Sequence, residues 1–165
     1  MQKTLPLLIV VLLAMLLFAA CKKSTTTPAV NATMAYTVDG VSSSTTAVAC
    51  FIDTITNGNS VTHNYYIDSQ ASSGTFPQLT VFVANPLPGT YPMGVYGATG
   101  TTAGVSYLAT NGGGAFQSVS GQVVITAISN TSISGTFQAT CTNTSVSPAT
   151  THTITAGSFT APISQ

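Results

Sequence analysis

The stretch FIDTITNGNSVTHNYYID, residues 51–68, places an Asn-Gly pair between two runs of β-forming residues. Asn57-Gly58 is a strong signal for a two-residue hairpin turn, because both turn positions need a positive φ angle. A turn there predicts that Cys50 lies opposite Tyr65. One face of the hairpin then collects the apolar side chains, which are Val48, Cys50, Ile52, Val61, Tyr65 and Ile67. The stretch therefore predicts an antiparallel sheet whose core face includes Cys50.

The chain from residue 32 onward repeats this pattern of short β-forming runs separated by Gly, Pro, Asn and Ser. The expected strands are 33–38, 45–55, 60–69, 78–84, 104–110, 121–128, 132–142 and 151–160. A second hairpin, residues 121–141, has its turn at Asn130-Thr131, and its register requires either a bulge or a strand covered on both faces. The pattern predicts an all-β fold, an antiparallel β-sandwich with a flattened β-barrel as the alternative.

The composition excludes several classes of partner. The 165 residues include no Arg and no Glu, and the lysines are Lys3, Lys22 and Lys23. A domain without basic side chains cannot neutralise phosphates, so nucleic acid is not an expected partner. No apolar run after residue 20 is long enough to span a bilayer, which takes about 20 residues. Hydroxyl and amide groups must therefore keep the domain in solution.

The N-terminal segment has the layout of a signal peptide. Lys3 gives a positive start, residues 5–20 are almost wholly apolar, and small residues precede Cys21. An uncleaved membrane helix is the alternative, which Pro6 and the shortness of the run disfavour. We expect a lipoprotein signal peptide over residues 1–20, a lipidated tether over 21–30 and a β-sandwich domain over 31–165.

The segment Phe18-Ala19-Ala20-Cys21 resembles the lipobox of bacterial lipoproteins, with Phe18 where Leu is commonest. The resemblance implies cleavage before Cys21 and acylation of this residue by palmitate-type chains, so that the protein is held in the cell envelope, at the outer membrane. The following Lys22-Lys23 could lie on anionic headgroups or be simply solvated. Lipoproteins of this kind often encode surface display by acidic residues after the cysteine. None follow here, so the periplasmic and surface faces both stay open.

A wider resemblance covers most of the remaining chain. Its segments are YTVDG (36–40), PGTY (88–91), GQVVIT (121–126), ISGTF (133–137) and HTITAGSF (152–159). Their order is similar to a family of small Bacteroidota lipoproteins of unknown function, with all-β domains that end in Gly-Thr-Phe and Ile-Thr-x-Gly-x-Phe strands. The resemblance implies the fold and the localisation, and it brings no catalytic residues.

Two cysteines remain when Cys21 is acylated. Cys50 and Cys141 both fall on apolar faces of their expected strands, and an even number of cysteines in an oxidising compartment favours a disulfide. The alternative is two unpaired thiols that pack as small apolar side chains. We expect the Cys50–Cys141 bridge.

Residues 85–121 are rich in Gly and Pro and hold one short expected strand. Loops carry binding residues more often than scaffolds do. The candidate binding surface consists of Tyr91, Tyr96, Tyr107 and Asn111. The alternative, which we prefer, is that these tyrosines close one end of the core.

No catalytic or metal-binding arrangement is expected. The sequence has no G-x-S-x-G elbow, and its acids are only Asp39, Asp53 and Asp68. His63 lies on the apolar face of the first hairpin and Asp53 on the opposite face, which disfavours a shared metal site. We expect no cofactor and no metal.

The expected function is therefore a non-catalytic binding or structural role in the envelope. The alternative is a carbohydrate- or glycoprotein-binding module, although the chain has no Trp for a stacking platform. Ice binding is a further reading of the threonines at 151, 153 and 155, but no fixed-period repeat supports it. The expected partners are the membrane, through the lipid anchor, and a glycan or protein ligand.

Overall fold

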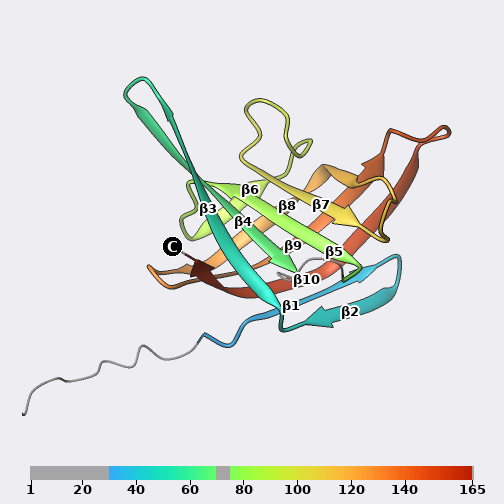
Figure 1. The fold of residues 1–165 in the computed structure, drawn as a ribbon, viewed down its shortest axis with the longest axis horizontal. Helices are drawn as coiled ribbons and strands as arrows, with labels where there is room; N and C mark the ends of the chain where they lie inside the picture. Colours follow the sequence, from blue (N-terminus) through green and yellow to red (C-terminus); the bar gives the residue numbers. More distant parts are fainter. Residues whose placement is uncertain (1–29, 70–74, 165) are drawn as a thin grey trace, which may run out of the picture.

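The computed structural model describes residues 30–69 and 75–164, and strands make up most of this part of the chain (Figure 1). The predictions for the signal peptide, for Cys21 and for most of the tether concern residues outside the described part of the chain. The ten strands found within the described ranges are β1 Thr33–Val38, β2 Val41–Thr45, β3 Val48–Asn57, β4 Ser60–Ser69, β5 Gln78–Ala84, β6 Gly89–Pro92, β7 Ala103–Leu108, β8 Phe116–Ile128, β9 Ser132–Asn143 and β10 Thr150–Ser164.

All these strands belong to one sheet that closes on itself. The closed ring runs β3-β4-β5-β7-β8-β9-β10 and returns to β3, through a short parallel pairing of Ile163 with Cys50. The other pairings are antiparallel. The prediction of an all-β antiparallel fold is confirmed, and the closed ring corresponds to its flattened-barrel form.

Two long strands, β8 and β10, each pair with two different strands along the same edge. β10 pairs with β1 along its middle and with β3 at its end. β8 pairs with β7 near its start and with β6 farther along. Figure 1 shows β3, β4 and β5 lying over β8, β9 and β10, with the tip of the β3–β4 hairpin extending beyond the rest. The hairpin β1–β2 therefore continues the sheet from β10, and the strand β6 continues it from β8, both outside the ring.

The first hairpin confirms the predicted faces but corrects the predicted pairing. Cys50 lies opposite Ile67, not opposite Tyr65, because the two-residue turn is Gly58-Asn59. Gly58 has φ +60°, and Asn59 is not among the residues with positive φ. A glycine in the first turn position is the requirement of a type II′ turn, the other favoured two-residue hairpin. The shift is two residues, so every side chain keeps its predicted face.

In the second hairpin, the register is explained by β-bulges, the first of the two predicted alternatives. β8 and β9 pair from Gln117–Thr142 to Ile128–Ile133, with bulges between Ser118 and Ser120 and between Ile125 and Ala127. Each bulge shifts the alternation by one residue. Val123 and Ile125 are fully buried, and the bulged strand explains why a simple two-residue period failed along 121–128.

The sequence also missed β2, β6 and the first residues of β8. β2 has the sequence VSSST and only partial burial, so it lacks the apolar alternation that identifies a strand. It exists because Asp39 and Gly40, with φ of 49° and 86°, form a turn that folds it back on β1. An Asp-Gly pair is typical of a turn, but no apolar alternation marks the strand after it.

The core contains a reciprocal pairing of glycine and phenylalanine. On β9 and β10, Gly157 lies opposite Phe137, and Gly135 lies opposite Phe159. Each ring occupies the space above the facing glycine, and the two ring centroids are 6.3 Å apart. A Cβ at Gly157 would lie 2.7 Å from the Phe137 ring and 2.5 Å from the Phe137 carbonyl oxygen. The two Gly-x-Phe segments are therefore halves of one packing unit.

Candidate functional site: the outer aromatic strip

The four residues predicted as one binding surface do not gather in the structure. Tyr107 is 8% exposed and faces the interior, with its ring edge-on to His152 at 5.7 Å. Tyr91 on β6 binds the backbone of Leu87, whose amide donates to its hydroxyl at 2.6 Å and whose carbonyl accepts from it at 2.9 Å. Asn111 is exposed in the loop after β7. The prediction of a common surface is wrong, and for Tyr107 the alternative of closing the core is correct.

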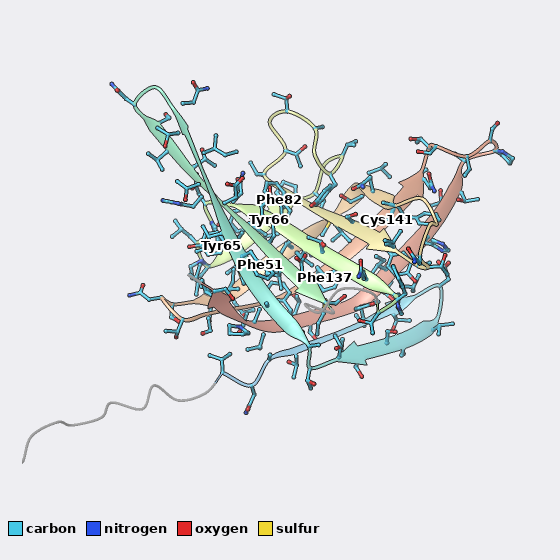
Figure 2. All side chains as sticks on the ribbon, in the orientation of Figure 1. Phe51, Tyr65, Tyr66, Phe82, Phe137 and Cys141 are labelled. Atoms are coloured by element: carbon cyan, nitrogen blue, oxygen red, sulfur yellow. The ribbon has the colours of Figure 1, made fainter. Side chains whose placement is uncertain are left out.

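Tyr96 does take part in a surface, but with partners from other segments. Phe51 on β3, Tyr66 on β4 and Phe82 on β5 are successive cross-strand neighbours on the outer face of the sheet. The ring centroids of Tyr66 and Phe82 are 5.4 Å apart, and Tyr96 meets Phe82 edge-on at 6.1 Å. Figure 2 labels the first three on the wall nearest the viewer. We name these four residues the aromatic strip.

The loop that carries Tyr96 is held in place by hydrogen bonds to the buried Ser118 on β8. The hydroxyl of Ser118 donates to the carbonyl of Gly94 at 2.8 Å and accepts from the amide of Val105 at 3.0 Å. Tyr96 itself covers Gly104 of β7, where a Cβ would lie 3.2 Å from the tyrosine ring. The buried Ser118 thus fixes the end of the strip, a role that its sequence context, QSV, does not signal.

The aromatic strip is accessible at one end and half-buried at the other. Phe51 is 44% exposed, whereas the other three rings are partly covered. Rings in such a row present apolar faces beside the hydroxyl groups of Thr80 and Ser106, and the aliphatic side chain of Ile55 is also exposed on this face. An exposed aromatic row of this kind is typical of a binding surface rather than of a scaffold.

A polar row runs beside the strip, two residues farther along each strand. Its members are cross-strand neighbours in the order Asp68, Thr80, Ser106 and Gln117. Burial raises the pKa of Asp68, and a hydrogen bond from Thr80 partly offsets this effect. Within the described residues, one carboxylate oxygen of Asp68 has no hydrogen-bond partner. The row therefore places a largely buried carboxyl group next to the aromatic rings.

The predicted Cys50–Cys141 disulfide is wrong in this structure. Both residues are buried free thiols, with the pKa of each raised to about 12 by burial. Cys50 is the neighbour of Ile163 on β10, and Cys141 is the neighbour of His152. Those two β10 positions are separated by roughly 35 Å of strand at ~3.3 Å per residue. A disulfide needs Cα atoms about 4.4–6.8 Å apart, so the inward direction of both thiols was predicted correctly but their separation was not.

We expect both of these thiols to be free in the isolated protein. Unreduced protein should gain two alkyl groups when it is denatured, and it should resist alkylation while folded because both thiols are buried. Intact-mass spectrometry measures this directly, with a reduced sample as the reference. A difference between the reduced and unreduced samples would contradict the structure.

One ion pair joins the β1–β2 turn to β10. Asp39 accepts from the amide of Thr153 at 2.8 Å and lies 2.5 Å from Nδ1 of His152. The Thr153 amide, and then His152, hold the pKa of Asp39 below its usual value. The ring of His152 also packs on Phe116 at 4.3 Å.

The cysteine that faces the Asp39–His152 pair does not have the properties of an activated nucleophile. Cys141 faces His152 across the strands, but burial raises the pKa of its thiol to about 12. A nucleophilic cysteine needs a lowered pKa instead. His63, the other histidine, lies on the β3–β4 hairpin 3.0 Å from the hydroxyl of Thr54. Within residues 30–69 and 75–164, no three His, Cys, Asp or Glu side chains gather as metal ligands would.

The fold and the strip define the class of this protein as a closed all-β domain with an aromatic outer face. Comparison with known proteins adds no relative, since no family model, curated protein or solved structure matches the chain. A search of the described residues also finds no helix with the length and apolar character to cross a membrane.

Proposed function

We propose that the protein is a non-catalytic lipoprotein of the bacterial cell envelope that binds neutral glycans through the aromatic strip. The observation that carries the proposal is the row of four rings, supplied by three strands and a loop held in place, on an outer face. Sugar rings expose C–H faces that pack on aromatic rings, and their hydroxyl groups need polar partners beside those rings.

The charge of the domain supports a neutral ligand. No Lys or Arg follows Lys23, so the domain has no basic side chain to bind carboxylate or sulfate groups of acidic glycans. Asp68, in the polar row beside the strip, disfavours a second negative charge. Uncharged polysaccharides or oligosaccharides fit these conditions best.

The sequence of the N-terminal segment supports the anchor. The lipobox-like residues before Cys21 and the polar tether after it favour a domain held near a membrane by acyl chains. Such a tether keeps the strip within reach of envelope glycans. The resemblance to small Bacteroidota lipoproteins agrees with this placement, and the outer membrane is the proposed site.

Truncation of the strip should weaken glycan binding. We expect Phe51→Ala and Tyr96→Ala each to reduce affinity about tenfold, the loss of ~1–2 kcal/mol that is typical of an aromatic contact residue. The measurement is a panel of neutral and acidic glycans against the full-length protein in detergent. Ile55→Ala is the matched control, because Ile55 is 49% exposed on the same strand and face but lies outside the strip.

Two results would count against the proposal. One is the absence of any neutral glycan among the ligands of the wild-type protein. The other is equal loss of binding in the Ile55→Ala control and the strip variants, which would indicate a general effect of hairpin hydrophobicity.

A further inference from the structure

Ala156 has an unusual backbone conformation. Its φ is 51°, in the left-handed region, and the other positive-φ residues outside glycine in the described chain are Asp39 and Asn85. Aspartate and asparagine tolerate this region, whereas alanine does so only under constraint from its surroundings. Strained residues of this kind concentrate at functional sites. The surroundings of Ala156 are therefore a candidate site.

Ala156 lies in a bulge that interrupts both ladders of β10 at once. The pairing with β9 shifts between Ile154 and Gly157. The pairing with β1 shifts between Ala35 and Thr37 of that strand, at the same level of β10. A bulge bends its strand and redirects side chains, and bulges are over-represented next to binding sites. Here the sheet surface is hollowed on both sides of β10.

Two neighbouring hollows on the outer face share Ala156 in their linings. The first, with a volume of about 320 Å³, extends over β8 and β9, and the second, of about 240 Å³, extends over β1 and β2. We name the combined hollow the bulge groove. Its polar lining includes Gln122, Thr136, Gln138, Ser158, Thr37 and Ser42.

The polar part of the bulge-groove lining consists of amides and hydroxyls without a charged side chain, and it lies beside apolar residues that include Ala35, Phe137 and Ala156. Gln122 and Gln138 are direct cross-strand neighbours, so two carboxamides lie side by side. Thr37 and Ser42 lie within 3.2 Å of each other through their hydroxyl oxygens. Amides and hydroxyls both donate and accept hydrogen bonds, as the neighbouring hydroxyls of a sugar do. The groove lacks the cations that an acidic ligand would need.

The bulge groove and the aromatic strip lie on different walls of the barrel. The strip runs over β3, β4 and β5, and the groove over β8, β9, β10 and β1. Figure 1 shows these two sets of strands as near and far layers. One ligand chain bound flat on either wall leaves the other wall free.

We propose that the bulge groove is a second binding site for a neutral polysaccharide, so that one protein molecule bridges two polysaccharide chains. The inference rests on the proposed function for the class of ligand, but the groove is a separate site with its own residues. Two sites on opposite walls give cross-linking without any change in the affinity of either site.

The test compares two sets of substitutions in the full-length protein in detergent. Gln122→Ala with Gln138→Ala removes both amides of the groove, and both residues are exposed, so the fold should persist. Thr142→Ala with Thr151→Ala is the matched control, a hydroxyl pair 3.2 Å apart on the same outer wall outside the groove. Thermal unfolding of each variant verifies the fold. The probes are dextran, galactomannan and a soluble β-glucan, with binding measured by calorimetry and cross-linking by light scattering.

We expect the groove variant to retain binding at the strip but to lose cross-linking, with about a tenfold loss at the second site. The Phe51→Ala, Tyr96→Ala double variant should show the converse, with binding retained at the groove. Unchanged cross-linking by the groove variant overturns the second site and leaves the strip intact. Unchanged binding by the strip variant, with complete loss in the groove variant, overturns the strip instead. Wild-type protein that binds none of the three probes overturns both.

Discussion

Replacing Gly157 by alanine is expected to lower the free energy of unfolding by about 2–3 kcal/mol, the upper range for overpacking in a core. The new methyl group would lie 2.5 Å from the Phe137 carbonyl oxygen and 2.7 Å from the Phe137 ring. Gly157 does not have a positive φ angle, so alanine suits the backbone and the cost comes from packing alone. Denaturant unfolding measures the difference.

Two further variants separate this packing effect from a general effect on β10. Ser158→Ala changes the next residue, which is exposed on the outer face, and should alter stability by less than about 0.5 kcal/mol. Phe137→Leu combined with Gly157→Ala should cost less than the sum of the single changes, because the smaller side chain makes room for the methyl group. Strict additivity would contradict the reciprocal Gly–Phe packing.

Replacing Cys21 by alanine is expected to remove the protein from the outer-membrane fraction and to abolish its labelling by palmitate. Acyl chains hold a protein to a bilayer with about 0.8 kcal/mol per buried CH₂ group. Loss of all the chains should therefore release nearly all of the protein from the membrane. Fractionation and metabolic labelling measure the two results. Cys21 lies outside the described residues, so this prediction depends on the sequence alone.

The neighbouring lysines provide the control for the anchor. Lys22→Ala with Lys23→Ala removes the positive charges beside Cys21. These charges contribute at most ~1 kcal/mol each at an anionic surface. The lysine variant should therefore stay labelled and membrane-bound. Palmitate labelling that persists in Cys21→Ala would show that the lipobox interpretation is wrong.

Side-chain direction was the part of the fold that the sequence predicted best. The two-residue period of the first hairpin placed Cys50 and Ile67 on the core face, and both are fully buried. Their pairing was shifted because Asn57-Gly58 and Gly58-Asn59 are both acceptable turns with different φ requirements. A period determines which face a residue occupies, but it does not determine its partner.

The sequence did not predict where along the barrel each inward-facing residue lies. Cys50 and Cys141 both point inward, yet they lie near opposite ends of β10. The order of strands in the ring sets that separation, and no local pattern encodes it. The aromatic strip was missed for the same reason, since Phe51, Tyr66, Phe82 and Tyr96 come from four separate segments of the chain.

The bulge at Ala156 gave no sequence signal because alanine is not a turn residue. A glycine at this position would have suggested a left-handed conformation, and the following Gly157 has a different role in packing. Ala156 is the residue that the two hollows of the bulge groove share. They could be found only once both neighbouring strands were known.

The shared edge of β10 has a consequence for the order in which the domain forms. β10 is the last of the ten described strands along the chain, and it pairs with β9, β1 and β3. The ring therefore cannot close until β10 has paired with both β9 and β3. Until then the edges of β1 and β3 are open to other chains, as unpaired strands are. Closure of the ring thus depends on pairings between distant parts of the sequence, which are intrinsically slow to form.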